Sequence, residues 1–435
     1  MDTPATRELP STPAVIPCHD PATGEHLGDV PVVGPAEVRE RVERARAAQR
    51  HWARTSFAER RCVLKRILAH LVEHTDELCQ MICRDAGKTL ENAVLGEIWP
   101  VCEKLRYTLA HGEAALRPER VSPGLLLHKR ATVEYHPLGV IGVICPWNFP
   151  LQNVLGPTIP ALFAGNAVVV KVSEWTSWSA ARIQAIFDEA LDAQGHPRDL
   201  VQVITGYADT GAALVSAGVG KIIFTGSMPN GRRVLAESAK TLTPVILELG
   251  GKDPMIICDD ADLEQAVHAA LAGTFIASGQ MCLAAERIYV QAAIYDRFVE
   301  RVVELAGQLR QAPPLTGPEP VDVGAMTMPG QVEIVDRLVR DAVAKGAVAR
   351  VGGRRGAHQG GAFYEPTVLT EVDHRMDIMR DETFGPVKLY PVQPGDYERA
   401  KAIIRLIYGK GLGARARSLG ALGRDLVRRR LGRAR

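Results

Sequence analysis

The chain has 435 residues and a mass of 47.2 kDa, roughly two to three times a typical domain, so we expect more than one hydrophobic core. Hydrophobic residues make up 46% and charged residues 23%, which excludes disorder as the main state. No apolar stretch approaches the ~18 residues of a spanning helix, and residues 1–20 lack a secretory pattern, so we expect a cytoplasmic protein without membrane contact.

Residues 35–115 are predicted to be helical. Pro35 is typical of a first helical turn, and apolar residues recur at helical spacing after it and again within Arg60–Glu73. Gly87 interrupts the pattern before a further helical run through Leu105. Residues 124–135 are rich in strand-forming residues and predict an extended ribbon or hairpin.

The rest of the chain alternates short apolar runs with helical stretches, which predicts βαβ units and parallel sheets. The first series of apolar runs is Val140–Ile144, Ala167–Val172, Val201–Ile204 and Lys221–Phe224. A second series has strands at Met255–Cys258 and Arg287–Val290 and helices at Leu263–Phe275, Ile294–Leu309 and Val332–Lys345. We therefore place a domain boundary near Leu249.

The eight cysteines are too sparse for a disulfide framework, and we expect most of them to be reduced and buried. His70, His74, Cys79 and Cys83 have the side chains of a zinc site. On one continuous helix, at about 100° per residue, the two pairs would face opposite ways. Only a break near Thr75–Asp76 could bring them together, so we predict no metal site.

Residues 405–435 contain ten Lys or Arg and one Asp. The simplest interpretation of this basic tail is a solvated helix or a frayed end. A single basic run is weak support for a nucleic-acid arm, so we expect no nucleic-acid partner.

Two residues of the second half could carry covalent chemistry. Cys282 ends the segment Ser278–Cys282, where backbone N–H groups can point inward and a nearby helix end would lower the pKa of the thiol. Glu248 follows the apolar run Val245–Leu247 and precedes two glycines, and apolar surroundings would raise the pKa of its carboxyl into the range of a general base. Each residue also has a plain structural interpretation, a buried cysteine and a surface glutamate at a strand edge.

Four further motifs contain residues suited to holding a ligand. Asn148 lies in Pro146–Pro150, where two prolines and two aromatic residues would hold its amide rigidly, as an oxyanion donor requires. Lys171–Glu174 ends a predicted strand, at the edge where parallel sheets bind ligands. Phe224–Ser227 leads from a strand into a helix, where a glycine and free N–H groups suit a phosphate. The last motif is Glu382–Pro386.

The order and spacing of these six motifs resemble the aldehyde dehydrogenase superfamily, with Cys282 34 residues after Glu248 and Lys171 23 residues after Asn148. The resemblance covers residues 20–404. It implies an α/β fold with a Rossmann-type NAD-binding domain, an α/β catalytic domain and an oligomerisation ribbon. We assign 1–118 to the helical part of the NAD-binding domain, 119–137 to the ribbon, 138–249 to the Rossmann-type part, 250–404 to the catalytic domain and 405–435 to the basic tail.

The resemblance also implies the reaction, oxidation of a small-molecule aldehyde to a carboxylic acid with NAD, or with NADP. Cys282 would attack the aldehyde, Asn148 and the Cys282 N–H would hold the oxyanion, and Glu248 would activate the water that hydrolyses the thioester. The implied cofactor-binding residues are Trp147, Lys171, Ser173, Glu174, Gly226, Ser227, Glu382 and Phe384. Glu174 favours NAD, because a carboxylate repels a 2′-phosphate.

Two alternatives remain. In a CoA-acylating relative a thiol would resolve the thioester, but such enzymes generally lack a carboxylate like Glu248. The family normally continues beyond this chain and adds a last strand to the oligomerisation sheet, whereas Tyr408–Ala414 is an altered form of a family segment. The sequence therefore predicts a truncated C-terminus, which puts the family's homo-oligomer in doubt and leaves an inactive protein with at most NAD binding as the second alternative.

Overall fold

The alternation in the middle of the chain folds as a five-stranded parallel sheet with strand order β7-β6-β5-β8-β9. The computed structural model describes residues 14–358 and 360–391. The strands are β5 (Val140–Ile144), β6 (Ala167–Lys171), β7 (Val201–Ile204), β8 (Lys221–Thr225) and β9 (Val245–Glu248). Every residue of β5 and β6 is buried, which explains why these strands are continuous apolar runs.

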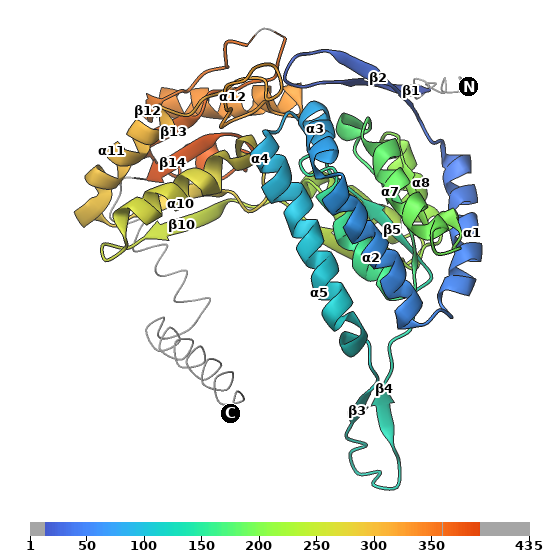
Figure 1. The fold of residues 1–435 in the computed structure, drawn as a ribbon. Helices are drawn as coiled ribbons and strands as arrows, with labels where there is room; N and C mark the ends of the chain where they lie inside the picture. The colour runs from blue at the N-terminus through green and yellow to red at the C-terminus, as the bar shows by residue number, and fades with distance from the viewer. Residues whose placement is uncertain (1–13, 359, 392–435) are drawn as a thin grey trace, which may run out of the picture.

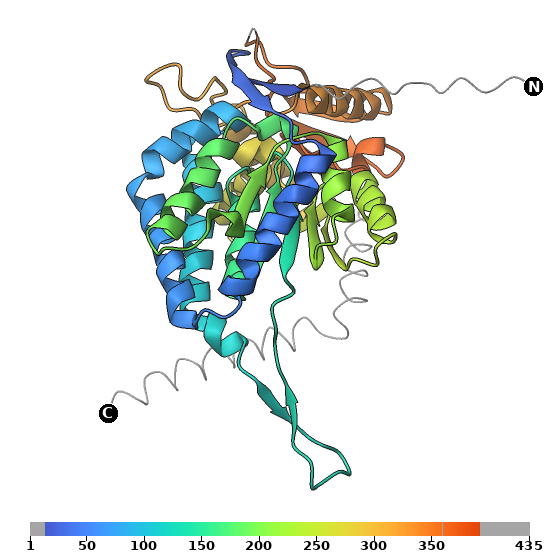
Figure 2. The ribbon, with the colours of Figure 1, turned by 90° about the vertical axis from the view of Figure 1, so that its right-hand side faces the viewer.

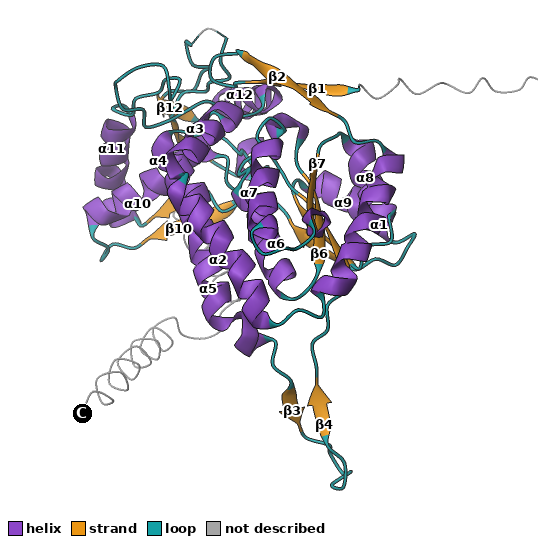
Figure 3. Ribbon diagram, turned by 45° about the vertical axis from the view of Figure 1, so that its right-hand side comes forward, coloured by secondary structure: helices purple, strands orange, loops and turns teal. Residues whose placement is uncertain are grey.

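Helices cover both faces of this sheet (Figures 1 and 3). One face carries α1 (Pro35–Trp52), α8 (Ala208–Ser216) and α9 (Met228–Ser238), and the other carries α6 (Gln152–Phe163) and α7 (Ala180–Asp192). Outside α6 and α7 lie α2 (Phe57–Glu73), α3 (Thr75–Ala86), α4 (Leu90–Ala93), the π-helix Val94–Ile98 and α5 (Trp99–Ala115). Pro35 is the first residue of α1, as predicted, and Ser56 and Glu59 form a capping box on α2.

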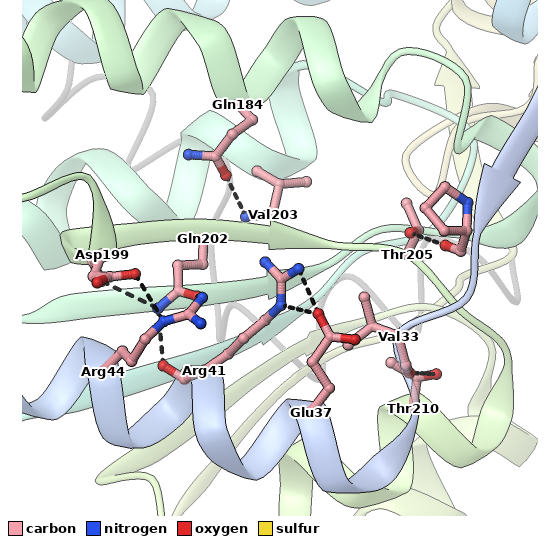
Figure 4. Close-up of polar contacts among 11 residues, drawn as sticks. Val33, Glu37, Arg41, Arg44, Gln184, Asp199, Gln202, Val203, Thr205 and Thr210 are labelled. Atoms are coloured by element: carbon pink, nitrogen blue, oxygen red, sulfur yellow. Dashed lines mark hydrogen bonds and ion pairs between the residues drawn. The ribbon is translucent and has the colours of Figure 1, made fainter.

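The N-terminal segment is tied to the sheet by contacts between residues far apart in the sequence (Figure 4). On α1, Arg44 forms an ion pair with Asp199, and the Arg41 carbonyl oxygen accepts a hydrogen bond from Gln202 Nε2 at 2.8 Å. Before α1, β1 (Val15–His19) and β2 (His26–Pro31) form a hairpin that the sequence analysis did not predict, and Thr205 Oγ1 donates to the Pro31 carbonyl oxygen. These bonds fix where the chain enters α1.

The second half forms another five-stranded sheet, of order β10-β11-β14-β13-β12, in which β12 is antiparallel to its neighbour. Its strands are β10 (Asp253–Ile257), β11 (Ala285–Val290), β12 (Val348–Val351), β13 (Thr367–Val372) and β14 (Val387–Pro391). Its helices are α10 (Leu263–Phe275), α11 (Tyr295–Ala306) and α12 (Pro329–Ala344). One core cluster draws on residues 33–224 and two others on residues 257–390, so the larger cores lie on either side of Leu249, and a small fourth cluster joins Ala22 to Ala325 and Phe363.

A hairpin projects from the end of α5, away from both sheets (Figures 1 and 2). It pairs β3 (Glu119–Val121) with β4 (Ala131–Val133), which confirms a hairpin here. The three leucines 125–127 belong to neither strand, contrary to the extended ribbon predicted from 124 onwards, and lie in the turn that joins the strands. They are 98%, 55% and 87% exposed, because the turn has no surface of its own chain to pack on.

The helix break that a zinc site would need is present, since α2 ends at Glu73 and α3 begins at Thr75. Nevertheless, no three His, Cys, Asp or Glu side chains within 14–358 and 360–391 are placed to hold a metal ion. In the same part of the chain, no helix is long and apolar enough to cross a bilayer. The basic tail and its altered family segment lie outside the described residues.

Candidate active site

The structure brings Asn148 to the loop that contains Cys282. Asn148 lies in the turn after β5, is 6% exposed, and donates from Nδ2 to the Gln280 carbonyl oxygen at 3.0 Å. Asn153 Nδ2 donates to the other end of the amide, Asn148 Oδ1, at 3.2 Å. Both ends of the side chain are therefore held, and the predicted amide donor is fixed two residues from the predicted nucleophile.

The loop before Cys282 is held in an unfavourable backbone conformation. Ala277 and Ser278 are buried and have φ values of 51° and 55°, in the left-handed region that favours glycine. The Ala277 N–H donates to Asn92 Oδ1 at 2.5 Å, and Ser278 Oγ donates to the Gly324 carbonyl oxygen at 3.0 Å. Strain of this kind persists where surrounding contacts fix the chain, and it is typical of functional sites.

The Cys282 residue is exposed, but the environment of its thiol raises rather than lowers its pKa. Partial burial of the sulfur is the main cause, and the nearby carboxylates of Glu382 and Asp253 add to it. The backbone N–H groups of Cys282 and Leu283 act in the opposite direction but are outweighed. The prediction of a lowered thiol pKa is therefore wrong for this arrangement, although the predicted N–H groups are present.

Glu248 ends β9, the outermost strand of its sheet, and its side chain is exposed. The prediction that apolar surroundings enclose this carboxyl is wrong, because β9 has a neighbour on one side only among the described strands. The two glycines after it do bring the motifs together. A Cβ on Gly251 would lie 3.2 Å from the Cys282 carbonyl oxygen, and one on Gly250 would lie 2.0 Å from Glu382 Oε2. A side chain at either position would therefore crowd the Glu382 carboxylate or the Cys282 loop.

The motif around Glu382 closes the other side of the site. Glu382 Oε1 accepts a hydrogen bond from the Gly251 N–H at 3.1 Å, and burial, with the charge of Glu286, raises the pKa of the Glu382 carboxyl. Phe384 has φ 48° and packs edge-on against Trp147, with 5.3 Å between ring centroids. Since Trp147 adjoins Asn148, this motif contacts both the glycine pair and the asparagine turn.

A buried network that the sequence analysis missed holds the Glu382 motif in place. Glu286, 3% exposed on β11, forms an ion pair with Lys252 and accepts the Thr383 N–H at 2.9 Å. Lys252 Nζ also donates to Thr383 Oγ1 at 2.7 Å. The available signals were weak, a lysine directly after the glycine pair and one acidic residue in an apolar strand.

Lys171, Ser173 and Glu174 gather at the carboxyl end of β6, as predicted. Lys171 Nζ lies 3.4 Å and Ser173 Oγ 3.5 Å from Glu174 Oε2. Burial lowers the pKa of the Lys171 ammonium, and the neighbouring Glu174 charge opposes this shift. Cys145 directly follows β5, is buried and donates from its thiol to the Asn153 carbonyl oxygen. Burial raises the pKa of this thiol, so Cys145 is a structural cysteine, as predicted.

Gly226 and Ser227 join β8 to α9, as predicted, but the Gly226 N–H is not free. It donates to the Glu248 carbonyl oxygen at 3.0 Å, because β9 continues alongside β8 at this point. Ser227 is the N-cap of α9 and makes no side-chain capping bond, so the N–H groups of the first turn are the ones available to an anion. The ends of β5, β6, β8 and β9 thus place four motifs along one edge of the sheet.

Comparisons with known proteins agree on one family. The sequence model of the Aldehyde dehydrogenase family matches residues 9–401. A putative aldehyde dehydrogenase-like protein of Schizosaccharomyces pombe is 39% identical over 381 residues, covering 86% of this chain and 73% of the relative. An NAD⁺ complex of a Bacillus cereus aldehyde dehydrogenase is 30% identical with a TM-score of 0.83, over 89% of this chain and 78% of that one. An Escherichia coli NADP-dependent enzyme is 34% identical with a TM-score of 0.82, over 88% and 78%. By this family match, these relatives and this fold, the chain belongs to the aldehyde dehydrogenase family.

Proposed function

We propose that the protein oxidises a small-molecule aldehyde to a carboxylic acid with NAD or NADP, through a covalent intermediate on Cys282. The observation that carries the proposal is the Asn148 amide, held at both ends and fixed on the Cys282 loop. A primary amide has two N–H groups. One of those on Asn148 Nδ2 is used by Gln280, which leaves the other to donate to a substrate oxygen.

The residues at the sheet edge fit a dinucleotide. Lys171, Ser173 and Glu174 offer an ammonium, a hydroxyl and a carboxylate at the end of β6 for ribose hydroxyls, and the first turn of α9 offers N–H groups for a pyrophosphate. Glu382, Trp147 and Phe384 would lie at the nicotinamide end. NAD is favoured over NADP, because the Glu174 carboxylate repels a 2′-phosphate. When bound, the dinucleotide supplies the hydride acceptor.

In the first half of the reaction Cys282 forms and holds the intermediate. The exposed thiol gives its proton to solvent, and Sγ bonds to the aldehyde carbon while the C=O π bond breaks and its electron pair passes to the oxygen, which takes the negative charge. Asn148 Nδ2–H and the Cys282 N–H would donate to that oxygen, which stabilises charge where it develops. Loss of hydride from carbon then leaves a thioester on Cys282.

In the second half water attacks the thioester carbon, and Glu248 accepts its proton. The C–S bond breaks, the carboxylic acid leaves and the thiol is regenerated. An exposed carboxylate at the end of β9 can reach water, which suits this role. The same residue disfavours the CoA-acylating alternative, where a second thiol would take the place of water.

The test is NADH formation by the full chain with a panel of aliphatic and aromatic aldehydes. We expect Cys282→Ala to abolish turnover and Cys62→Ala, at another exposed cysteine, to leave it unchanged. Asn148→Ala should lower kcat by ~10²–10³, the usual cost of one oxyanion donor. Glu248→Gln should leave a single burst of NADH followed by slow turnover. A folded protein that oxidises no aldehyde, or activity that survives Cys282→Ala, would overturn the proposal.

A further inference from the structure

Lys88 and Glu97 form a buried ion pair that belongs to none of the six motifs. Lys88 Nζ lies 2.7 Å from Glu97 Oε1, and the two side chains are 1% and 0% exposed. Burial lowers the pKa of the lysine and raises that of the glutamate, and each partner's charge opposes the other's shift. Because removing two charges from water costs about as much as their attraction returns, stability alone does not explain the pair.

The second oxygen of Glu97 holds the chain just after Asn148. Glu97 Oε2 accepts the N–H of Leu151 at 3.1 Å and that of Gln152 at 2.8 Å. These N–H groups lie where α6 begins, so they have no acceptor within that helix. The carboxylate satisfies both and faces the positive end of the α6 dipole.

Lys88 and the π-helix hold the residue next to Asn148 from two sides. The Lys88 ammonium lies 3.4 Å from the centroid of the Phe149 ring, a cation–π contact that burial strengthens. Gly96, in the π-helix, leaves room for the same ring: a Cβ there would lie 2.8 Å from Phe149 Cε1. The ring is therefore in contact with the ammonium on one side and close to the π-helix backbone on another.

The same short segment also holds the loop before Cys282. Asn92, between Lys88 and Glu97, accepts the Ala277 N–H through its Oδ1, and Asn92 Nδ2 is held in turn by Thr89 Oγ1. Residues 88–97 thus contact the Asn148 turn at one end and the Cys282 loop at the other.

We propose that Glu97, neutralised by Lys88, is a positioning residue that sets the Asn148 amide against the nucleophile loop, and this rests on the proposed function. The hydrogen bonds that Glu97 accepts, rather than its charge, do the positioning. Neutral replacement of both partners separates the two effects, because it leaves no unpaired buried charge. Lys88→Met with Glu97→Gln keeps an oxygen for Leu151 and Gln152, whereas Lys88→Met with Glu97→Leu does not.

We expect kcat of the double variant with Glu97→Gln (Met/Gln) to stay within about threefold of wild type. The double variant with Glu97→Leu (Met/Leu) should lose ~10² in kcat, which is the scale expected when a catalytic group is misplaced by about 1 Å. KM for NAD should stay unchanged in both. Glu91→Gln, an exposed residue of α4 between the pair, is the control and should match wild type. A folded Met/Leu variant with wild-type kcat would overturn the proposal.

Amide hydrogen exchange tests the same contact without substrate, so it distinguishes failure of this inference from failure of the proposed function. A peptide that contains Leu151 and Gln152 should exchange faster in the Met/Leu than in the Met/Gln variant, and equal rates would contradict the role of Glu97. If the Met/Leu variant does not fold, Gly96→Ala decides. In this variant the alanine has the higher helix propensity, but its Cβ displaces the Phe149 ring. We therefore expect kcat to fall while Tm is kept. An unchanged kcat would overturn the proposal.

Discussion

At the scale of single residues, the proposed nucleophile and the proposed water-activating carboxylate are more exposed than the charged side chains that hold the loops around them. Cys282 and Glu248 are exposed, whereas Lys88, Glu97 and Glu286 are almost fully buried and bind backbone N–H groups or a neighbouring charge. A buried carboxylate that accepts two or more hydrogen bonds fixes backbone positions firmly, because every alternative leaves a charge without a partner.

Asp85 gives a prediction at this scale. It is 1% exposed on α3 and accepts the Ser179 N–H at 3.0 Å, just after the Lys171–Glu174 cluster. Burial raises the pKa of its carboxyl from 3.8 to about 7, and the charge of Asp20 adds to this, against the hydrogen bonds from Ser179 and Trp178. Between these two values the folded protein binds a proton that the unfolded chain lacks. Stability from Asp85 is therefore lost as pH rises from 3.8 to about 7.

We expect Asp85→Asn to remove this loss, because an amide keeps the oxygen for Ser179 without a titrating charge. The Tm of the variant minus that of wild type should increase from pH 5 to pH 8. The increase should correspond to a few kcal/mol in the free energy of unfolding. Thermal unfolding across this range measures it. Asp76→Asn, at an exposed residue of the same helix, is the control, and its difference should not depend on pH. Parallel curves for Asp85→Asn and wild type would contradict the prediction.

At the scale of secondary structure, the sequence predicts an element well where burial alone defines it. Strands β5 and β7 and helix α10 have the predicted bounds, because each coincides with apolar residues at the spacing of its own element. Prediction fails where an element depends on a distant partner. The three leucines 125–127 favour strand but have no partner opposite them, and the β1–β2 hairpin contains Pro17 and Gly28, which weaken its strand pattern.

The same limit applies to the site. Candidate residues could be chosen from motif order, but their ionisation and exposure depend on segments that fold beside them. The pKa of Cys282 is raised partly by Glu382, which lies 100 residues further along the chain, and the exposure of Glu248 follows from the place of β9 at the edge of its sheet. Neither relationship can be predicted from the residues next to Cys282 or Glu248 in the sequence.

The hairpin β3–β4 carries a prediction of its own. Three exposed leucines in succession on a projecting turn form an apolar patch, and such patches mark contact surfaces. The resemblance described above implies that this ribbon serves oligomerisation. We expect the triple substitution Leu125→Ser, Leu126→Ser and Leu127→Ser to reduce self-association, measured by light scattering after size exclusion, and to leave Tm of the monomer unchanged. Lys129→Ser in the same turn is the control. If wild type is an oligomer and the triple variant has the same mass in solution, this prediction is wrong.

At the scale of the whole molecule, the candidate site lies between two parts of the chain, here called units, whose larger cores are separate and which share only a small cluster of Ala22, Ala325 and Phe363 among the described residues. The first unit carries the asparagine turn, the Lys171–Glu174 cluster and the start of α9, and the second carries Cys282, Glu382 and Phe384. The glycine pair Gly250–Gly251 lies where the chain passes from one to the other and touches residues of the second unit. Catalysis as proposed therefore requires both units to be folded and docked, whereas dinucleotide binding depends mainly on the first.

This division predicts how the protein unfolds when heated. Because the cores are separate, calorimetry should show two transitions rather than one. A ligand that binds only the folded form stabilises it by about 2.7 kcal/mol at a concentration 100 times its Kd. NAD should therefore raise the transition of the first unit and shift the second much less. In Lys171→Met the NAD-dependent shift should shrink, since the buried ammonium beside Glu174 is lost. A single transition, or equal shifts of both, would show that the two units unfold together and that cofactor binding stabilises the molecule as a whole.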